Sequence, residues 1–195
     1  MNADPLDDPI SRLRAWYREA EEATPNADVV ALATASIDAI PSVRMVNFRG
    51  WQEGCLSFYT NYESRKGAEL SGNPRATMLF YWSALGRQIR VEGTCKRMDV
   101  PASQTYFASR HRESQLSTLM SRQSAELQSF DWMERCVAEL REEYAGRDIP
   151  CPPYWGGMLL EPARIEFHIA RRHRRHYRWE YWRDIDKWKM RRLHP

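Results

Sequence analysis

The sequence predicts an α+β protein made mainly of β-strands: an antiparallel barrel, closed or nearly closed, with flanking helices. Short runs rich in β-branched and aromatic residues dominate the chain, and helical segments are inserted between them. Strands and helices do not alternate regularly and there is no GxGxxG fingerprint, so a dinucleotide-binding Rossmann domain is not expected. The 195 residues suffice for one domain, residues 1–195, with a substantial core.

A capped helix opens the chain and strands follow it. Asp8 and Pro9 precede apolar residues at helical spacing, which predicts an amphipathic helix to about Ala23, inside an N-terminal helical segment of about residues 1–25. Apolar and β-prone runs then predict strands at residues 29–35, 43–48, 56–60, 76–82 and 87–97, the last two as antiparallel partners.

Residues 44–67, RMVNFRGWQEGCLSFYTNYESRKG, are the most informative stretch. They predict two strands of one hairpin, followed by the start of a helix that carries Arg65 and Lys66. The free amides of a helix start, nearby hydroxyls and two adjacent cations form a good receptor for phosphate. Arg44 and Arg49 bring further positive charge from the neighbouring strand. Spacing alone fits a hairpin with solvated basic ends as well.

Helices are expected in the middle of the chain, and strands after residue 150. One helix begins at Pro101, residues 109–124 are polar with helical pieces, and residues 129–144 form an amphipathic helix. Four residues from Pro150 to Pro153 include three prolines and end that helix. Strands are then expected near residues 157–160, 165–169, 174–182 and 188–193.

The composition argues against several classes of protein. There is no run of 18 apolar residues and no secretory signal at the N-terminus, so neither a membrane span nor export is expected. The four cysteines are widely spaced without a CxxC pair, which favours free thiols in a reducing cytoplasm and no metal site. A net charge of +3 does not by itself argue for nucleic acid.

Seven motifs in order along the chain resemble those of the pyridoxamine/pyridoxine 5′-phosphate oxidase family: FYTNYESRKG, NPRATMLFYW, RQIRVEG, YFASRHRESQ, SRQS, YWGG and WKMRRLHP. The likeness runs from Asp4 to Pro195. It implies an FMN-binding split β-barrel and a homodimer with two sites at the subunit interface. The strands of about residues 150–195 would serve dimerisation and the active site.

The resemblance also implies which residues contact FMN. Arg65 and Lys66 match the family's pair for the FMN phosphate, in agreement with the phosphate receptor expected above. Gln123 and Ser124, in SRQS, match flavin contacts from the partner subunit, although without the family this segment is an ordinary polar loop. The full implied FMN set is Arg44, Met45, Val46, Tyr59, Thr60, Arg65, Lys66, Gln88, Gln123, Ser124, His168 and Arg178.

A second set of residues matches the family's contacts to a phosphorylated pyridine substrate. Tyr106, Arg110 and Ser114 fit a Y-x-x-x-R-x-x-x-S pattern, whose spacing of four places them roughly along one helical face. A phenol, a guanidinium and a hydroxyl that converge would clamp a phosphate. Without the resemblance, a surface pair between Arg110 and Glu113 is the simpler interpretation. Arg49 matches a further substrate contact.

The run RRHRRHYR at residues 171–178 is the second informative segment. If it lies in a strand, alternation places Arg174, His176 and Arg178 on one side. These three match the family's R-x-H-x-R, in which the first arginine and the histidine are catalytic and touch the substrate ring, and the last arginine lies by the flavin. As a linear cluster of charge the run would also suit nucleic acid.

Four departures from the family pattern are visible. Arginine replaces the usual lysine at Arg49, which keeps the charge on a longer, forked side chain. Histidine replaces the usual tryptophan at His168, which removes apolar area and adds a titrating group. Asn47 and Phe48 stand where the family has a leucine pair, and the N-terminus is short.

The implied activity is oxidation of pyridoxamine or pyridoxine 5′-phosphate to pyridoxal 5′-phosphate. Hydride would pass from the substrate C4′ to flavin N5, with dioxygen (O2) as acceptor and hydrogen peroxide (H2O2) as product. One alternative is an oxidase of the same fold for another aromatic substrate, of the phenazine-biosynthesis type. Another is a non-catalytic module that binds flavin or nucleic acid.

Overall fold

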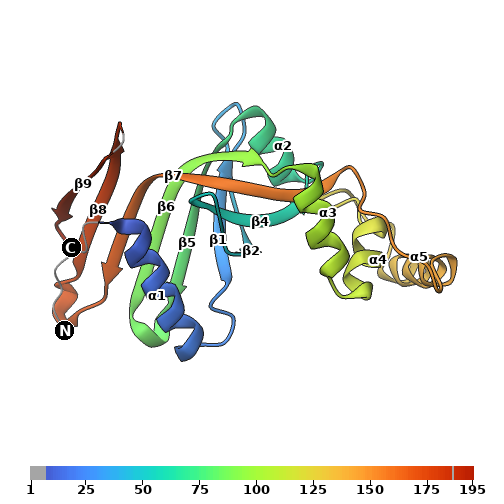
Figure 1. The fold of residues 1–195 in the computed structure, drawn as a ribbon, viewed down its shortest axis with the longest axis horizontal. Helices are drawn as coiled ribbons and strands as arrows, with labels where there is room; N and C mark the ends of the chain where they lie inside the picture. Colours follow the sequence, from blue (N-terminus) through green and yellow to red (C-terminus); the bar gives the residue numbers. More distant parts are fainter. Residues whose placement is uncertain (1–7, 186) are drawn as a thin grey trace.

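The computed structural model describes residues 8–185 and 187–195, and its centre is a nine-stranded antiparallel sheet (Figure 1). The pairing order is β2-β1-β5-β6-β7-β4-β3, and β8 and β9 extend from β7. The strands are β1 (Val29–Ala35), β2 (Pro41–Asn47), β3 (Trp51–Gln52), β4 (Cys55–Asn61), β5 (Arg75–Trp82), β6 (Arg87–Arg97), β7 (Trp155–Ile169), β8 (Tyr177–Asp184) and β9 (Lys187–Leu193). The helices are α1 (Pro9–Ala23), α2 (Arg65–Gly72), α3 (Val100–Ser109), α4 (Arg112–Met120) and α5 (Phe130–Glu143), with single 3₁₀ turns at Ser83–Leu85 and Arg172–Arg174.

The barrel is nearly closed rather than closed. Strand pairing runs from β2 at one end of the path to β3 at the other. The loop after β2 approaches β4, because Arg49 N donates to Ser57 O at 2.8 Å and Ser57 N donates to Gly50 O at 2.9 Å. Of the two forms expected from the sequence, the structure has the split one.

The expected hairpin of residues 44–67 is wrong in its pairing. β2 pairs along its whole length with β1, from Pro41 opposite Ala35 to Asn47 opposite Val29. The hairpin partner of β4 is the short β3, through a turn at Glu53 and Gly54 whose φ angles are both positive. Gly50, with φ +91°, breaks the chain between β2 and β3, and this places Arg44 on the β1 side of the barrel.

Helix α1 covers one face of the sheet with its apolar side. Asp8 caps the helix, since its carboxylate accepts from the amides of Ile10 and Ser11, and Leu13 and Trp16 are buried. Trp16 meets Phe167 of β7 edge to face at 5.1 Å between ring centroids. The predicted start and end of this helix are confirmed from residue 8 onward; residues 1–7 of the expected helical segment lie outside the described residues.

A single strand, β7, replaces the two strands expected at 157–160 and 165–169. It pairs with β4, β6 and β8 and so joins the barrel strands to β8 and β9. The pairing with β6 shifts between Glu92 and Gly93, opposite Pro162. A proline lacks an amide proton and is accepted in a sheet at such a bulge.

The C-terminal strand begins later than expected. Arg174 lies in the 3₁₀ turn with φ +58°, and β8 begins only at Tyr177. The expectation that strand alternation puts Arg174, His176 and Arg178 on one side is therefore wrong, because only Arg178 is in a strand. The chain instead turns at His173 and Arg174, where both φ angles are positive.

Helices α3, α4 and α5 project from the opposite end of the molecule to β8 and β9 (Figure 1). A small core of Phe107, Leu116, Ile149 and Trp155 holds them to the sheet. The amphipathic helix expected at residues 129–144 is confirmed as α5, which Ser129 caps through the amide of Trp132, and its apolar face is only half-buried. Within the described ranges, none of the helices is long and apolar enough to cross a membrane.

Candidate functional site

A pocket of about 1120 Å³ lies between β2, β4, the start of α2 and the α3–α5 helices. Thirteen of the residues expected to bind cofactor or substrate line it, although they come from segments far apart in the sequence. They are Arg44, Met45, Val46, Arg49, Tyr59, Thr60, Arg65, Lys66, Tyr106, Arg110, Ser114, Gln123 and Ser124.

The start of α2 places two cations at the pocket wall. The hydroxyl of Ser64 accepts from Gly67 N at 3.3 Å and caps the helix, as the sequence predicted. Arg65 and Lys66 follow in the first turn, where helix amides have no partner inside the helix and the dipole favours an anion. Local sequence thus brings together donors and cations that suit a phosphate.

Lys66 is a buried ammonium group held by neutral oxygen atoms. Its Nζ donates to Gln123 Oε1 at 2.9 Å, to Thr60 Oγ1 at 3.1 Å and to Ser64 Oγ at 3.2 Å. The side chain is only 7% exposed. Burial, followed by the charge of Arg44, lowers the pKa of Lys66 to about 8. A bound anion would compensate this charge, so the group fits a phosphate.

Gln123 comes from the same chain as Lys66, which corrects the expectation that it reaches the site from a partner. The α4–α5 loop carries it to Lys66, and Asn61 Nδ2 anchors the loop by donating to Ser121 O at 3.3 Å. Ser124 follows with φ +76° and lines the same pocket. The motif SRQS could not reveal this placement, because it depends on how α4 packs.

Arg44 is tied into the wall by its own barrel strands. Its Nη1 donates to Leu32 O at 3.1 Å and to Thr34 Oγ1 at 2.5 Å. Its Nη2 donates to Ser42 Oγ and to the Glu69 carboxylate. The guanidinium is therefore fixed and supplies positive charge at the pocket, while the Arg65 side chain is 60% exposed.

Three aromatic rings stack at the other side of the pocket. Tyr59 and Tyr106 lie 3.8 Å apart between centroids, and Tyr59 and Trp155 lie 5.3 Å apart, both nearly parallel. The Arg110 guanidinium lies 4.8 Å from the Trp155 ring centroid. Trp155 was not among the expected site residues, although it stands in the YWGG motif.

The three residues of the expected substrate clamp meet at the junction of α3 and α4. Tyr106 lies on α3, Ser114 on α4, and Arg110 in the extended residue between the two helices. The Nη1 of Arg110 donates to Thr118 Oγ1 at 2.7 Å. The surface pair with Glu113 does not form: Glu113 binds Arg141 at 2.8 Å, so Arg110 keeps its place at the pocket.

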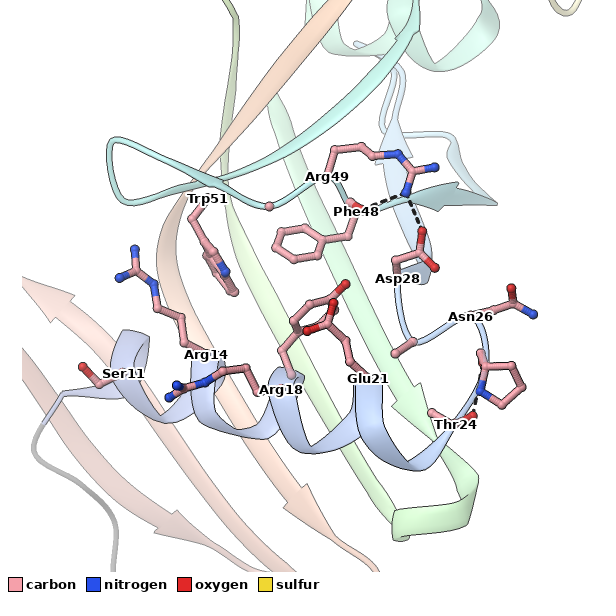
Figure 2. Close-up of a pocket in the computed structure, with 14 residues that line it drawn as sticks. Ser11, Arg14, Arg18, Glu21, Thr24, Asn26, Asp28, Phe48, Arg49 and Trp51 are labelled. Carbon is pink, nitrogen blue, oxygen red and sulfur yellow. Dashed lines mark hydrogen bonds and ion pairs between the residues drawn. The ribbon is translucent and has the colours of Figure 1, made fainter. Parts of the chain in front are cut away.

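Arg49 lines both this pocket and a second one of about 1220 Å³. Figure 2 shows the second pocket, which helix α1 and the loop after β2 enclose. The Nη1 of Arg49 donates to Asp28 Oδ2 at 2.5 Å. Burial lowers the pKa of Arg49, but hydrogen bonds to Asp28 and Tyr106 outweigh it and the net pKa is raised.

The remaining expected residues form a second group at the other end of the sheet. Gln88, His168 and Arg178 are opposite one another on β6, β7 and β8. His176 lies 4.8 Å from His168 between ring centroids, and burial lowers the pKa of His168, with His176 and Arg178 adding to the effect. Glu166 Oε1 accepts from Arg178 Nε at 2.7 Å. Arg174 is exposed in the turn before them.

Strand β7 keeps the two groups apart within one chain. Trp155 begins this strand at the pocket and His168 is next to its last residue. A strand rises about 3.3 Å per residue, so the two residues are roughly 40 Å apart along its path. One chain therefore carries two separate groups of expected site residues, one at each end of β7.

Two family models match the chain. Residues 17–144 match the model described as pyridoxamine 5′-phosphate oxidase, and residues 155–195 match the C-terminal dimerisation region of pyridoxine 5′-phosphate oxidase. The second match covers β7, β8 and β9.

Full-length relatives and solved structures agree with these matches. A pyridoxine/pyridoxamine 5′-phosphate oxidase from Rubrobacter xylanophilus is 46% identical over 99% of this chain and 88% of its own length. One from Sphingopyxis alaskensis is 42% identical, over 100% and 91%. The crystal structure of PhzG from Burkholderia lata 383, in complex with tetrahydrophenazine-1-carboxylic acid, superposes with a TM-score of 0.93 at 33% identity, over 98% and 95% of the two chains.

The fold, the donors and cations at the start of α2 and the matches along the whole length lead to one conclusion. The chain belongs to the pyridoxamine 5′-phosphate oxidase family.

Proposed function

We propose that this protein is an FMN-dependent oxidase that converts pyridoxamine or pyridoxine 5′-phosphate to pyridoxal 5′-phosphate, with O2 as acceptor and H2O2 as product. The observation that carries the proposal is the buried ammonium of Lys66, which neutral oxygens surround at the start of α2. Relatives named pyridoxine/pyridoxamine 5′-phosphate oxidase support the substrate class.

The residues around Lys66 fit the phosphate of FMN. Arg65 has a largely exposed guanidinium, Arg44 supplies fixed positive charge, and the first-turn amides of α2 supply donors. Thr60 and Tyr59 continue the wall and would contact the ribityl chain, and Met45 and Val46 line the pocket from β2. When bound, FMN supplies the two-electron acceptor that O2 reoxidises.

The aromatic stack and the clamp would hold the substrate. Tyr106, Arg110 and Ser114 offer a phenol, a guanidinium and a hydroxyl to a substrate phosphate, and Arg49 adds a second guanidinium. The stack of Tyr106, Tyr59 and Trp155 would give this side of the pocket a flat apolar surface against which a substrate ring can pack. These residues bind and orient the substrate, which is the protein's main contribution when a cofactor carries the chemistry.

We infer a homodimer in which a partner completes each site. The match of residues 155–195 to a dimerisation region supports it, and so does the separation of the two residue groups along β7. In this assembly Gln88, His168 and Arg178 would face the flavin of the partner. Arg174 and His176 would face its substrate, with His176 as a hydrogen-bonding group to the ring.

We propose that the protein is a single domain and that it works in the reducing cytoplasm. All four cysteines have free thiols in the structure, which supports a reducing compartment.

The decisive experiment is the absorption spectrum of the purified protein loaded with FMN. Anaerobic pyridoxine 5′-phosphate should bleach the bound flavin, and air should restore its colour with release of peroxide. A flavin spectrum that neither pyridoxine 5′-phosphate nor pyridoxamine 5′-phosphate changes would contradict the substrate class. A protein that binds no FMN would contradict the whole proposal.

The similarity to PhzG gives a second candidate, an oxidase for a non-phosphorylated aromatic substrate. The clamp discriminates between the two. Arg110→Ala should raise the KM for pyridoxine 5′-phosphate sharply and leave FMN binding intact, because Arg110 lies by Trp155 and not by Lys66. An unchanged KM would favour the second candidate.

A further inference from the structure

We propose that Glu69 is a positioning residue of the FMN-phosphate site, because its buried carboxylate holds the guanidinium groups of both Arg44 and Arg65. The inference rests on the function proposed above and adds a residue that lies behind the pocket wall. Glu69 is on α2, one turn after Arg65, and is 7% exposed.

The two oxygens of the Glu69 carboxylate accept from different partners. Oε1 accepts from Arg65 Nε at 2.9 Å. Oε2 accepts from Arg44 Nη2 at 3.2 Å and from the hydroxyls of Ser42 and Thr34 at 2.6 and 2.5 Å. One carboxylate thereby links α2 to β1 and β2 and fixes the distance between the two arginines.

The hydroxyls of Thr34 and Ser42 bridge Glu69 and Arg44 and so help to fix the orientation of the Arg44 guanidinium. Thr34 and Ser42 each accept from Arg44, so the proton of each hydroxyl points to Glu69. Both Nη groups of Arg44 are then occupied by protein acceptors. Arg65 uses only its Nε toward Glu69, so the planar geometry of its guanidinium presents the outer Nη groups to the pocket.

The charge of Glu69 also matters for Lys66. Burial alone would raise the pKa of Glu69, but hydrogen bonds from Ser42, Thr34 and Arg65, together with the charge of Arg44, lower it to about 2. The carboxylate is therefore ionised at any working pH. Its charge raises the pKa of Lys66, against the burial and the Arg44 charge that lower it. No other charged group perturbs Lys66 in the described chain.

A competing effect has the opposite sign, because a carboxylate near the site repels a phosphate. The Glu69 carboxylate accepts hydrogen bonds from two guanidinium groups and two hydroxyls. These donors compensate much of its negative charge, so its repulsion of a bound phosphate is weakened. Removal of Glu69 would leave two neighbouring guanidinium groups and a buried ammonium to repel one another. Without Glu69, the guanidinium groups would lose their fixed orientation and Lys66 would be protonated less often. These two losses should weaken FMN binding more than the removal of a negative charge near the phosphate strengthens it.

Three variants of the full-length protein test the proposal through the Kd for FMN, measured by quenching of flavin fluorescence at pH 7. Glu69→Ala should raise the Kd at least tenfold. Glu69→Gln should fall between Glu69→Ala and the natural protein, because the amide accepts from the hydroxyls but turns a donor toward Arg65. Glu161→Gln is the matched control, since Glu161 is 57% exposed and pairs only loosely with Arg183 at 3.8 Å; its Kd should stay within twofold.

Two further readouts separate positioning from a merely structural role. At saturating FMN, kcat of Glu69→Ala should stay within about threefold of the natural value, because the reacting groups are elsewhere. A series of Kd values from pH 6.5 to 9.5 should show that FMN binding begins to weaken at a lower pH in Glu69→Ala, because Lys66 loses its proton earlier.

Each outcome decides between the two proposals. If the natural protein fails to bind FMN, the proposed function is wrong. If it binds FMN and folded Glu69→Ala binds equally well or more tightly, the role of Glu69 is overturned. If Glu69→Ala does not fold, as judged by circular dichroism, Glu69→Gln decides: an unchanged Kd and an unchanged pH profile overturn the role.

Discussion

The guanidinium of Arg49, a residue that lines both pockets, donates to the carboxylate of Asp28 at 2.5 Å. Asp28 precedes β1 and Arg49 follows β2, so the pair closes the end of this two-stranded ladder beside the backbone bond from Phe48 N to Asp28 O. The longer reach of an arginine allows one side chain to meet both Asp28 and the Tyr106 side of the substrate pocket.

This pair predicts the behaviour of two variants at residue 49. Arg49→Ala should raise the KM for pyridoxine 5′-phosphate about tenfold or more, because a charge-assisted hydrogen bond contributes about 1.5–3 kcal/mol. Arg49→Lys keeps the charge and should stay within a few-fold. Steady-state peroxide assays give both values, and the Kd for FMN should not change. A normal KM for Arg49→Ala would exclude this residue from substrate binding.

Lys66 predicts opposite effects of pH on stability and on FMN binding. Its pKa in the folded protein, about 8, is below the ordinary 10.5, so between these values the unfolded chain holds more protons. The ligand-free protein should therefore gain stability as pH rises from 8 to 10.5. FMN binding should weaken over the same range, approaching a tenfold rise in Kd per pH unit, because the phosphate is already dianionic and its cation is lost.

Thermal unfolding without FMN and fluorescence titration with FMN measure the two effects. In Lys66→Met, whose side chain cannot titrate, the gain in stability between these pH values should be smaller than in the natural protein. Parallel pH profiles for the natural protein and Lys66→Met would contradict the assignment.

Thr118 holds Arg110 of the proposed substrate clamp through a hydrogen bond. Thr118→Val removes the acceptor at 2.7 Å while keeping the shape, and should raise the KM for pyridoxine 5′-phosphate about tenfold. Thr118→Ser keeps the hydroxyl and should behave like the natural protein. Steady-state kinetics at saturating FMN compare the two variants. Equal KM values for Thr118→Val and Thr118→Ser would show that the position of Arg110 does not depend on this hydrogen bond.

Gly93 predicts a stability effect at the bulge between β6 and β7. A Cβ at this position would lie 1.9 Å from Glu161 O, a backbone atom that cannot move alone. Gly93→Ala should lower the free energy of unfolding by about 2–3 kcal/mol or more. Gly72→Ala is the control: the nearest atom is 3.9 Å away, and alanine in a helix should leave stability equal or slightly higher. Urea unfolding measures both.

Local signals predicted most elements of the fold. The helix starts expected at Asp8, at Arg65 and at residue 129 are confirmed, and in the structure Asp8, Ser64 and Ser129 cap them. The pairing of β5 with β6 is confirmed as well. These features depend on neighbouring residues, so that a single sequence is sufficient to reveal them.

Features that depend on distant packing were not predictable. The alternation of β2 identifies a strand but not its partner, and Pro162 made one long strand resemble two. The clamp of Arg44 by Glu69 combines residues from β1, β2 and α2, and only the spacing of Arg65 and Glu69 hinted at it. The positive φ angles at His173 and Arg174 have no signal in a run of basic residues.

The length of β7 has a genetic consequence. If each site takes its phosphate receptor from one subunit and its Arg178 group from the other, a Lys66 mutant and an Arg178 mutant each damage a different one of these two contributions to a site. A mixed dimer would then hold one intact site and one doubly damaged site. Co-expression of the two inactive alleles should restore about a quarter of the natural activity, since half of randomly paired dimers are mixed. Two copies of the same allele should restore none.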